Sequence, residues 1–600
     1  MTEGKTVRLP RGYWGRDRTR AILDKVLTTR YEVDLGGLGP GEHAALAELL
    51  AAGHALQDLA EDTEHHQALR ARRRLHELHE RLGRPPATAD LLELYELNQG
   101  PIATTLDNEL LPFLPVDPYA HGRNVYPWAI TADEVEAFVA ERPDRRAWIL
   151  DSHTTVRRTT VAAVKGDLAT LRRYPVLAGL HPGLVEYLHA VAATPERDAL
   201  YAVPYSVAWP EAVLDVAGYL HRAAVAVGDE DPDFADFLRL RSRDLLADDN
   251  EAGDAAWVRG TFNQLDVVVG AHETYDDELF GAKAFFGLAI LLREPTGTAE
   301  LRDRMGHVQA IEDALPTDRH RTVASEIPVG SFDVIAAFGQ GTGPVAEILP
   351  NDPVLIRKYG RKILLRHNFQ VAPGPFELLA ARWRAAMAPV HHDELTPEGM
   401  FRQTTWHEVG HYLGPDTDRS GRSLDAALGE DAAILEELKS ELVSSFACRW
   451  LGEAGAFSPE EVTSVVAGCI LAGLRPVRPL RAQPYPTLWV MLLNHHLEAG
   501  ALRIEADGIH IDHARMPDAV ETMLRQALAI QDHGSRVESN AFIERYSTWD
   551  ERHEQIAARI RAVERYRSLH ARFAILDGPD PATLRAGTRP PSTKAPPRAS

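Results

Sequence analysis

Two histidines and a carboxylate stand close together at His407, Glu408 and His411. Because residues four apart lie on one face of an α-helix, the two imidazoles can reach a single metal ion. Glu408 would then lie beside a water molecule polarised by that ion and could accept its proton. The pattern predicts a zinc hydrolase, although a chain with 26 histidines can also carry so short a motif by chance.

The residues around this motif predict one helix. A threonine, a proline and a glutamate at 396–398 supply a capping hydroxyl, a first helical residue and an acid in the first turn. A Gly-Pro pair at 414–415 is typical of a helix end. We therefore expect His407 and His411 to share one face of a helix between these signals.

A second segment, 434–443, offers the third ligand that a catalytic zinc ion requires. Glu437 and Glu441 stand four apart on its predicted helix, and two like charges at that spacing repel unless a cation or a histidine N–H lies opposite. We assign Glu437 as the ligand and Glu441 as an outer partner that fixes a histidine tautomer. Glu436 could share this outer role or could be an ordinary solvated acid.

The two helical motifs together resemble the zinc site of the dipeptidyl peptidase III family, the M49 metallopeptidases, whose second motif has the form Glu-Glu-x-x-x-Glu. The first motif here has five residues, as in some bacterial relatives, whereas eukaryotic members have six. The resemblance implies one Zn²⁺ ion per chain, held by His407, His411 and Glu437. It also implies that Glu408 is the general base of a metallopeptidase that releases dipeptides.

Further segments extend the resemblance over roughly residues 90 to 575; they lie at 122–127, 203–206, 269–281 and 349–352. By this resemblance Glu273 holds the free ammonium group of the substrate and Tyr275 hydrogen-bonds the developing oxyanion. Asn351 is implied to grip the amino-terminal end of the peptide. Without the resemblance, Glu273 and Tyr275 would be no more than a strand end followed by an acidic turn.

Other positions depart from the family pattern. Ile348 stands where the family has an asparagine, Gly287 where it has a carboxylate, and Tyr485 and Trp489 where relatives have a histidine and often an arginine. Two alternatives to a dipeptidyl peptidase therefore stay open: the same zinc site acting on a small metabolite, modified peptide or amide, and a non-catalytic zinc-containing binding protein. The presence of Glu408 argues against the second, because a structural zinc site needs no general base.

Composition narrows the class of protein. A chain of 600 residues can bury a large core and should form more than one lobe. A net charge of −22 argues against nucleic-acid binding. Two cysteines, Cys448 and Cys469, lie in apolar helical segments and are interpreted as free thiols. Since we find neither a signal-peptide pattern nor a long apolar run, we expect a cytoplasmic protein that does not cross a membrane.

The coarse pattern of elements predicts an α+β protein that is predominantly α-helical. Helical spacing recurs at 40–83, 133–141, 181–193, 210–227, 233–247 and through most of 374–576. Short β-branched segments near 265–269, 286–293, 333–337 and 363–369 predict a small mixed sheet or barrel.

These elements suggest two lobes separated by a wide cleft. We expect an N-terminal lobe over 1–290, joined by 330–370, and a helical zinc-binding catalytic lobe over 370–576. A disordered tail should follow over 577–600, which is rich in Pro, Ala, Arg, Ser and Thr. The expected partner is a peptide or small amide substrate, and the sequence does not indicate an oligomeric state.

Overall fold

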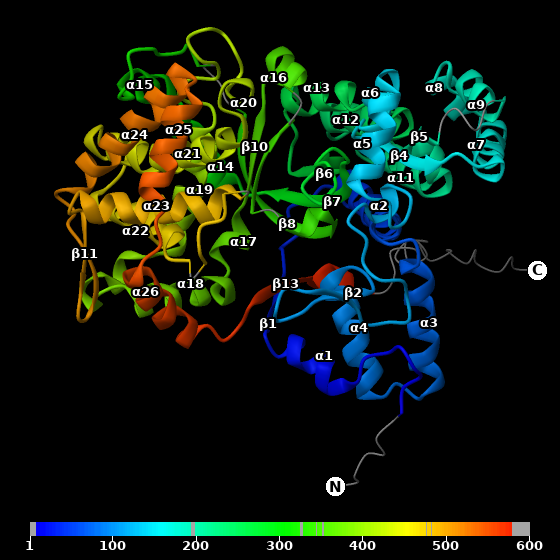
Figure 1. The fold of residues 1–600 in the computed structure, drawn as a ribbon, viewed down its shortest axis with the longest axis horizontal. Coiled ribbons are helices and arrows are strands. Elements are labelled where there is room, and N and C mark those ends of the chain that lie inside the picture. The colour runs from blue at the N-terminus through cyan, green and yellow to red at the C-terminus, as the bar shows by residue number, and fades with distance from the viewer. Residues whose placement is uncertain are drawn as a thin grey trace, which may run out of the picture.

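The computed structural model describes residues 8–193, 199–323, 328–343, 345–350, 353–475, 477–481 and 483–578. Helices form two lobes on either side of a central sheet (Figure 1). This arrangement confirms the predicted α+β, helix-dominated fold class. Asn351 and nearly all of the predicted tail at 577–600 lie outside the described residues.

The central sheet has five strands in the order β6-β7-β8-β10-β9. Their bounds are Leu265–Glu273 for β6, Phe285–Arg293 for β7, Val329–Gly339 for β8, Ala346–Leu349 for β9 and Lys362–Arg366 for β10. Strand β10 runs parallel to β8, and the other neighbours are antiparallel, so the sheet is mixed as predicted. The expected strand over 363–369 is wrong at its end, because residues His367–Val371 form helix α17.

Helices cover both faces of this sheet, which explains its nearly continuous apolar strands. Helix α2 (Pro40–Glu64) packs on β7 and β8. Helix α14 (Pro295–Met305) contacts β8 too. At the first interface a Cβ on Gly53 would overlap the Phe338 ring, so only glycine allows α2 to approach the sheet this closely.

The helices around α2 build the core of the N-terminal lobe. They include α5 (Ala132–Glu141), α11 (Pro210–Val227), α12 (Pro232–Ala247) and α13 (Glu251–Arg259), whereas α9 (Leu184–Ala193) packs on α7 (Val161–Arg173) in a separate, smaller core. The single helix expected over 40–83 is wrong: it breaks after Glu64, and α3 (Ala68–Arg81) begins anew. At the break the His65 ring contacts the carbonyl oxygen of Asp117 at 3.1 Å and accepts a hydrogen bond from the Gln67 N–H, so local side-chain bonding replaces the helical ladder.

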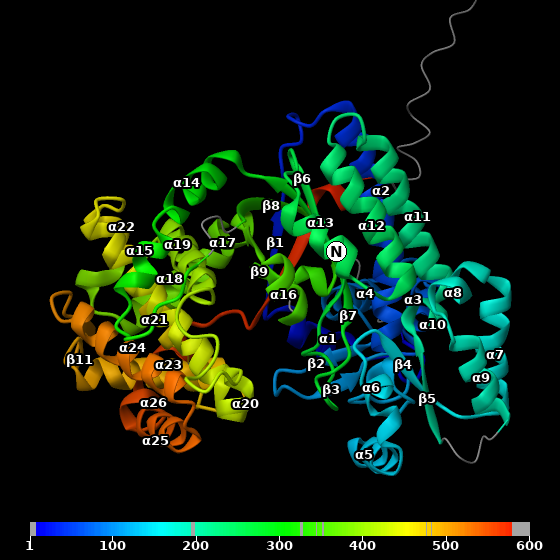
Figure 2. The same cartoon turned by 90° about the horizontal axis from the view of Figure 1, so that it is seen from above.

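Long helices make up the second lobe, coloured yellow-green to red in Figures 1 and 2. They are α18 (Pro373–Ala386), α19 (Pro397–Gly410), α21 (Ala432–Glu453), α22 (Pro459–Gly473), α23 (Pro484–Glu498), α24 (Met516–His533), α25 (Arg536–Tyr546) and α26 (Glu551–Val563). Helix α21 lies at the centre and contacts α19, α22, α23 and α24. It therefore buries side chains all round, which suits a helix that must hold functional groups rigidly.

The last strand of the chain, β13, pairs with the first strand, β1. Strand β13 (Ser568–Phe573) pairs in parallel with β1 (Val26–Tyr31) through six residue pairs from Val26–Ser568 to Tyr31–Phe573. Residues 568–573 thus lie beside the N-terminal part of the chain, whereas the sequence assigned them to the helical lobe. The remaining lobe boundaries stay a prediction.

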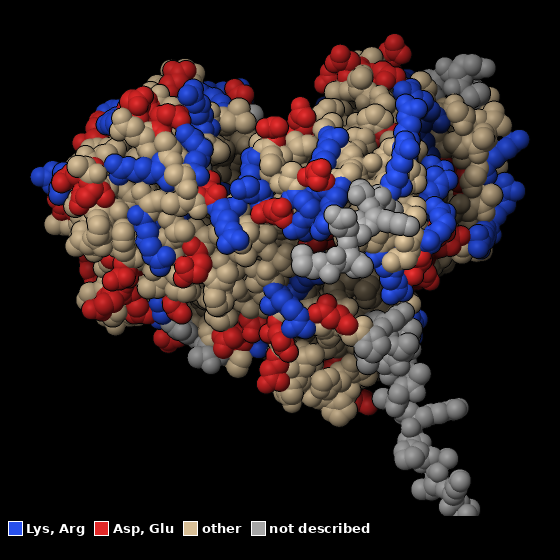
Figure 3. Space-filling model, turned by 90° about the horizontal axis from the view of Figure 1, so that it is seen from below, with Lys and Arg blue, Asp and Glu red and all other residues tan. Residues whose placement is uncertain are grey.

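A notch separates the two lobes in the space-filling view of Figure 3. Helices of the second lobe and those of the first lie on opposite sides of the sheet when the molecule is seen from above (Figure 2). Within the described ranges we find no helix whose length and apolar character would allow it to cross a bilayer.

Candidate metal centre

Helix α19 carries the predicted histidine pair. It begins as expected, with the Thr396 hydroxyl accepting a hydrogen bond from the Gly399 N–H at 3.0 Å and Pro397 in the first position. The last helical residue is Gly410, so His411 is the C-cap and still has helical backbone angles. The two imidazole centroids lie 5.1 Å apart, which places both rings on one side of α19.

Helix α21 crosses α19 at very short range. A Cβ on Gly410 would lie 2.8 Å from the Cα of Ser440, and one on Gly399 would overlap Ser464 of α22. Glycine at these positions lets the backbones approach closely, at a cost in helix propensity of about 1 kcal/mol relative to alanine. The close crossing brings the carboxylates of α21 up to the histidines of α19.

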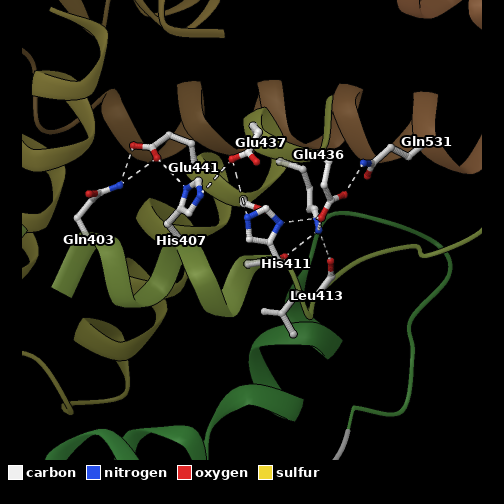
Figure 4. Close-up of polar contacts among 11 residues, drawn as sticks. Gln403, His407, His411, Leu413, Glu436, Glu437, Glu441 and Gln531 are labelled. Carbon is white, nitrogen blue, oxygen red and sulfur yellow. Dashed lines mark hydrogen bonds and ion pairs between the residues drawn. The ribbon is translucent and has the colours of Figure 1, made fainter. Parts of the chain in front are cut away.

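The three predicted ligands meet at this crossing (Figure 4). The Nε2 atom of His407 lies 3.3 Å from Oε2 of Glu437, and Nε2 of His411 lies 3.9 Å from the same oxygen. One ligand atom from each of the three side chains lies within 4.8 Å of the other two. This spacing fits a set of groups that share one ion.

Outer carboxylates orient both rings. Nδ1 of His407 lies 3.0 Å from Glu441 Oε2, and the Gln403 amide donates to both Glu441 oxygens at 3.0 and 2.9 Å. A proton on Nδ1 satisfies this contact and leaves the Nε2 lone pair facing Glu437. Glu441 thus occupies the outer position that the sequence indicated.

His411 has its own outer partner, Glu436. Nδ1 of His411 lies 3.1 Å from Glu436 Oε1 and 3.0 Å from the Ser440 hydroxyl. Glu436 is also bound by Lys439 at 2.8 Å and by the amide of Gln531 at 3.2 Å. Its carboxylate therefore belongs to the ring-orienting contacts, and the interpretation as a simple solvated acid is wrong.

The electrostatics of the crossing favour a bound cation. Burial opposes charge on His407, but the adjacent Glu437 and Glu441 raise its pKa to about 10. Burial likewise acts against ionisation of Glu436, yet Lys439 and His411 lower its pKa to about 2. The pKa of Glu437 is also lowered, against burial, by the two histidines. An extra proton on His407 or a metal ion can compensate this concentration of negative charge.

The residues present fit a zinc ion. Oε2 of Glu437 is buried and has no hydrogen-bond partner among the described residues, although an oxygen in that position normally has one. Two imidazole nitrogens face it, and a set of two histidines and one glutamate is a combination that catalytic zinc uses while keeping a position for water.

Glu408 lies on α19 between the two histidines and is half-buried. Two residues that were not predicted as part of the site act electrostatically together with Glu408: Tyr412, and Arg361 immediately before β10. Burial lowers the pKa of Arg361, and the nearby Tyr412, Glu436 and Glu408 act in the opposite direction. Arg361 is far from the motif in the sequence, so only the fold could reveal it.

Three further contacts of the centre were also missed, namely Gln403, Lys439 and Gln531. Gln403 stands four residues before His407, so helical spacing could have placed it on the same face. Lys439 lies on α21 three residues after Glu436, and its Nζ bonds the carbonyl oxygens of Gly410 and Leu413 at 2.8 and 2.9 Å. It thereby fastens the end of α19 to α21. Gln531 comes from α24, and no local signal points to it.

The predicted substrate residues lie on the sheet side of the molecule. Glu273 ends β6 and is half-buried, whereas Tyr275 follows it with 63% of its side chain exposed. The charged neighbours of Tyr275 include Asp276, Glu273 and Glu347, and within the described chain no hydrogen bond joins it to α19 or α21. The structure therefore does not bring Tyr275 into contact with the three candidate ligands.

The departures from the family pattern have distinct structural roles. The Tyr485 hydroxyl, on α23, helps to lower the pKa of the Glu437 carboxyl group, after the larger effects of burial and of the two histidines. Ile348 pairs with Ile363 in the sheet. Gly287 lies in β7, where a Cβ would be 2.7 Å from the backbone N of Gly341, so no carboxylate side chain fits there.

Comparison with known proteins supports the fold. No family model matches the chain. The structure of DPP III from Caldithrix abyssi has a TM-score of 0.77 and 23% identity, covering 94% of this chain and 99% of that one. The structure of dipeptidyl-peptidase III from Corallococcus sp. strain EGB gives 0.74 and 22%, covering 95% and 98%. The chain thus has the dipeptidyl peptidase III fold, and the predicted resemblance is confirmed at that level.

A curated relative matches part of the chain. Nudix hydrolase 3 of Arabidopsis thaliana is 26% identical over 359 residues, which are 58% of this chain and 46% of that protein. The matched region therefore spans about half the length of this relative.

Proposed function

We propose that this protein is a zinc-dependent metallopeptidase that hydrolyses peptide bonds near a free amino terminus. The observation that carries the proposal is the meeting of His407, His411 and Glu437 around an unpartnered buried carboxylate oxygen. Bound zinc would supply a Lewis acid that polarises water and the scissile carbonyl. The shared fold with two dipeptidyl peptidase III structures supports a peptide as the substrate.

The chain's own residues would perform the proton transfers. Glu408 accepts a proton from the attacking water and returns it to the leaving amine. Glu441 and Glu436 hold the Nδ1 protons of the two histidines, so that both Nε2 lone pairs would be free to hold the ion. Tyr485 favours the charged form of Glu437, whose pKa it helps to lower. Glu273 would hold the substrate ammonium group, and Tyr275 would donate to the oxyanion once the lobes close over the peptide.

The decisive experiment replaces the general base. Glu408→Gln should keep about the same zinc content as wild type and lose roughly 100- to 10,000-fold in kcat on dipeptidyl arylamides. Glu398→Gln is the matched control, because Glu398 is exposed in the first turn of the same helix. Full activity of Glu408→Gln would contradict the assignment.

A substrate panel separates the proposal from its alternative, the same site acting on a modified peptide, an amide or a small metabolite. The observation favouring this alternative is that Gly287 leaves no room for a carboxylate side chain. Unblocked oligopeptides should be cleaved and their N-acetylated forms rejected, because an ammonium group at Glu273 is then missing. Equal cleavage of blocked and unblocked substrates would instead favour the alternative.

A further inference from the structure

Tyr275 lies in a tight turn directly after β6. The Asp277 N–H donates to the Thr274 carbonyl oxygen at 3.0 Å, which closes a β-turn. Tyr275 and Asp276 are the two central residues of this turn. The Tyr275 side chain is 63% exposed and forms no hydrogen bond with any residue that the structure describes. The direction of its hydroxyl therefore depends on how rigidly the turn itself is held.

The carboxylate of Asp277 holds the chain that follows the turn. It is 4% exposed. Its Oδ1 accepts the N–H groups of Leu279 and Phe280 at 3.0 and 3.2 Å. Its Oδ2 accepts those of Ala282 and Lys283, both at 2.9 Å. An asparagine could not replace this carboxylate, because its NH2 group would meet two N–H donors.

Two side chains from a distant segment bond the turn from the other side. Tyr126 is 2% exposed and donates its hydroxyl to Oδ2 of Asp277 at 3.0 Å. Arg123 donates from Nε to the carbonyl oxygen of Asp276 at 3.1 Å and from Nη2 to its Oδ1 at 3.2 Å. Both central and closing residues of the turn are thus bound by side chains more than 150 positions earlier.

The far end of the loop is anchored as well. Lys283 is fully buried, and its Nζ donates to the carbonyl oxygens of Ile149 and Asp151, both at 2.7 Å. The Tyr205 hydroxyl donates to the carbonyl oxygen of Ala284 at 3.0 Å. Hydrogen bonds therefore fix the loop between β6 and β7 at both of its ends.

We propose that Asp277 and Tyr126 are positioning residues that hold Tyr275 for its part in the reaction. A donor to the oxyanion is effective only in the geometry that the transition state requires, and a misplacement of about 1 Å can cost roughly 100-fold in rate. Segments 122–127 and 203–206, to which the sequence assigned no role, would act through this loop. The inference rests on the proposed peptidase function, in which Tyr275 donates to the oxyanion.

The test is a double-mutant cycle on the zinc-loaded protein, with the dipeptidyl arylamide that wild type cleaves fastest. Tyr275→Phe should lower kcat roughly 100- to 1,000-fold. Asp277→Asn should lower kcat about 10- to 100-fold, with KM within about threefold of wild type and the zinc content unchanged. The double variant should be no slower than Tyr275→Phe, because the hydroxyl that the turn positions is already absent.

Tyr126→Phe is a milder variant that keeps the test valid if Asp277→Asn does not fold. It removes one hydrogen bond and leaves the four backbone donors of Asp277 in place, so kcat should fall about 3- to 10-fold. Tyr201→Phe is the matched control. The Tyr201 hydroxyl also donates to a buried carboxylate, that of Asp167 at 2.6 Å, but in a separate small core. Its kcat should equal that of wild type.

Hydrogen–deuterium exchange of residues 274–284 gives a readout that does not depend on turnover. Exchange should be faster in Asp277→Asn and Tyr126→Phe than in wild type, and unchanged in Tyr275→Phe and Tyr201→Phe. This pattern separates a loosened turn from a lost hydroxyl.

Two kinetic results would overturn the inference: an unchanged kcat in both Asp277→Asn and Tyr126→Phe, or a double variant that shows the product of the two single losses. Unchanged exchange in both would overturn it too. If wild type cleaves no peptide, the peptidase proposal fails, and the exchange data alone then decide whether Asp277 and Tyr126 hold the turn.

Discussion

Two clusters of the same residue types lie in the C-terminal half of the chain. The first is His407, His411 and Glu437, here called the helical cluster; the second is His391, Glu394 and His513, here called the loop cluster. In each cluster one ligand atom per residue lies within 4.8 Å of the other two, and each cluster contains a buried carboxylate oxygen without a described hydrogen-bond partner. Spacing alone therefore does not separate them.

The hydrogen bonds of the histidine rings distinguish the helical cluster from the loop cluster. In the loop cluster, Nε2 of His391 accepts the Ile511 N–H at 3.0 Å, so its Nδ1 must carry the proton that it donates to Glu394 at 2.8 Å. A metal ion would have to displace that proton and break the backbone contact. In the helical cluster the outer carboxylates take the Nδ1 protons, and both Nε2 atoms stay available. The contacts of the second nitrogen of each ring thus decide whether two histidines and a glutamate can bind a metal.

The largest expected difference between the clusters is in metal content. His411→Ala should lower bound zinc from about one ion per chain to near zero, because only two ligands remain. His513→Ala should leave the content unchanged. Inductively coupled plasma mass spectrometry of both gel-filtered variants beside wild type measures the zinc content. Equal losses of zinc in the two variants would show that the two clusters do not differ in metal binding.

Replacing one of the outer carboxylates is expected to have a smaller effect on zinc binding. Glu441→Gln should weaken zinc affinity about 10- to 100-fold, because the His407 ring loses the acceptor that fixes its tautomer. Glu394→Gln, the corresponding change in the loop cluster, should leave the affinity within twofold of wild type. Competition with a fluorescent zinc chelator measures both values. A loss on Glu394→Gln as large as that on Glu441→Gln would show that the loop cluster contributes to binding.

The helical cluster also depends on the close crossing of two helices. Gly410→Ala should lower the free energy of unfolding by about 1–3 kcal/mol, because the new methyl group meets the Ser440 backbone at 2.8 Å. Gly166→Ala is the control, since Gly166 lies within α7 (Val161–Arg173) and a methyl group added there would meet no neighbouring atom within 4 Å. Gly166→Ala should raise the free energy of unfolding by about 0.5–1 kcal/mol. Urea unfolding followed by circular dichroism distinguishes the two outcomes, and a destabilising Gly166→Ala would weaken the packing argument.

The smallest effect concerns pH and belongs to the loop cluster. The hydrogen bond to Glu394 raises the pKa of His513, so the ion pair contributes fully below the unfolded histidine pKa of about 6.5 and is lost as pH rises through the raised folded value. Because the His513 side chain is 41% exposed, solvent screening limits the contribution to about 0.5 kcal/mol. The Tm difference between wild type and His513→Gln should therefore shrink from pH 6 to pH 9. A difference that grows over this range would reverse the sign argued here.

Local signals explain how much of the fold the sequence could predict. Where a proline opens a helix and apolar spacing runs unbroken, prediction and structure agree, as for 210–227 and α11 (Pro210–Val227). The break at His65–Gln67 was missed, because its cause is a contact between His65 and the distant Asp117. Strand β13 was missed too, since Ser568–Phe573 becomes a strand only by pairing with a segment more than 500 residues earlier.

The residues of the candidate site also differ in whether local sequence signals could predict them. His407, His411 and Glu437 were predictable because helical spacing sets which side chains share a face. Arg361 and Gln531 were not, because Arg361 precedes β10 and Gln531 lies on α24, and only the fold brings these separate elements near the centre.

The parallel pairing of β1 with β13 has a mechanical consequence. The first strand enters this small sheet from the beginning of the chain, and the last leaves it toward the end. A force that pulls the two ends apart would therefore load the strand pair in shear, so that its hydrogen bonds share the load instead of opening one after another. The β1–β13 pair therefore resists stretching from the ends of the chain before tension reaches the rest of either lobe.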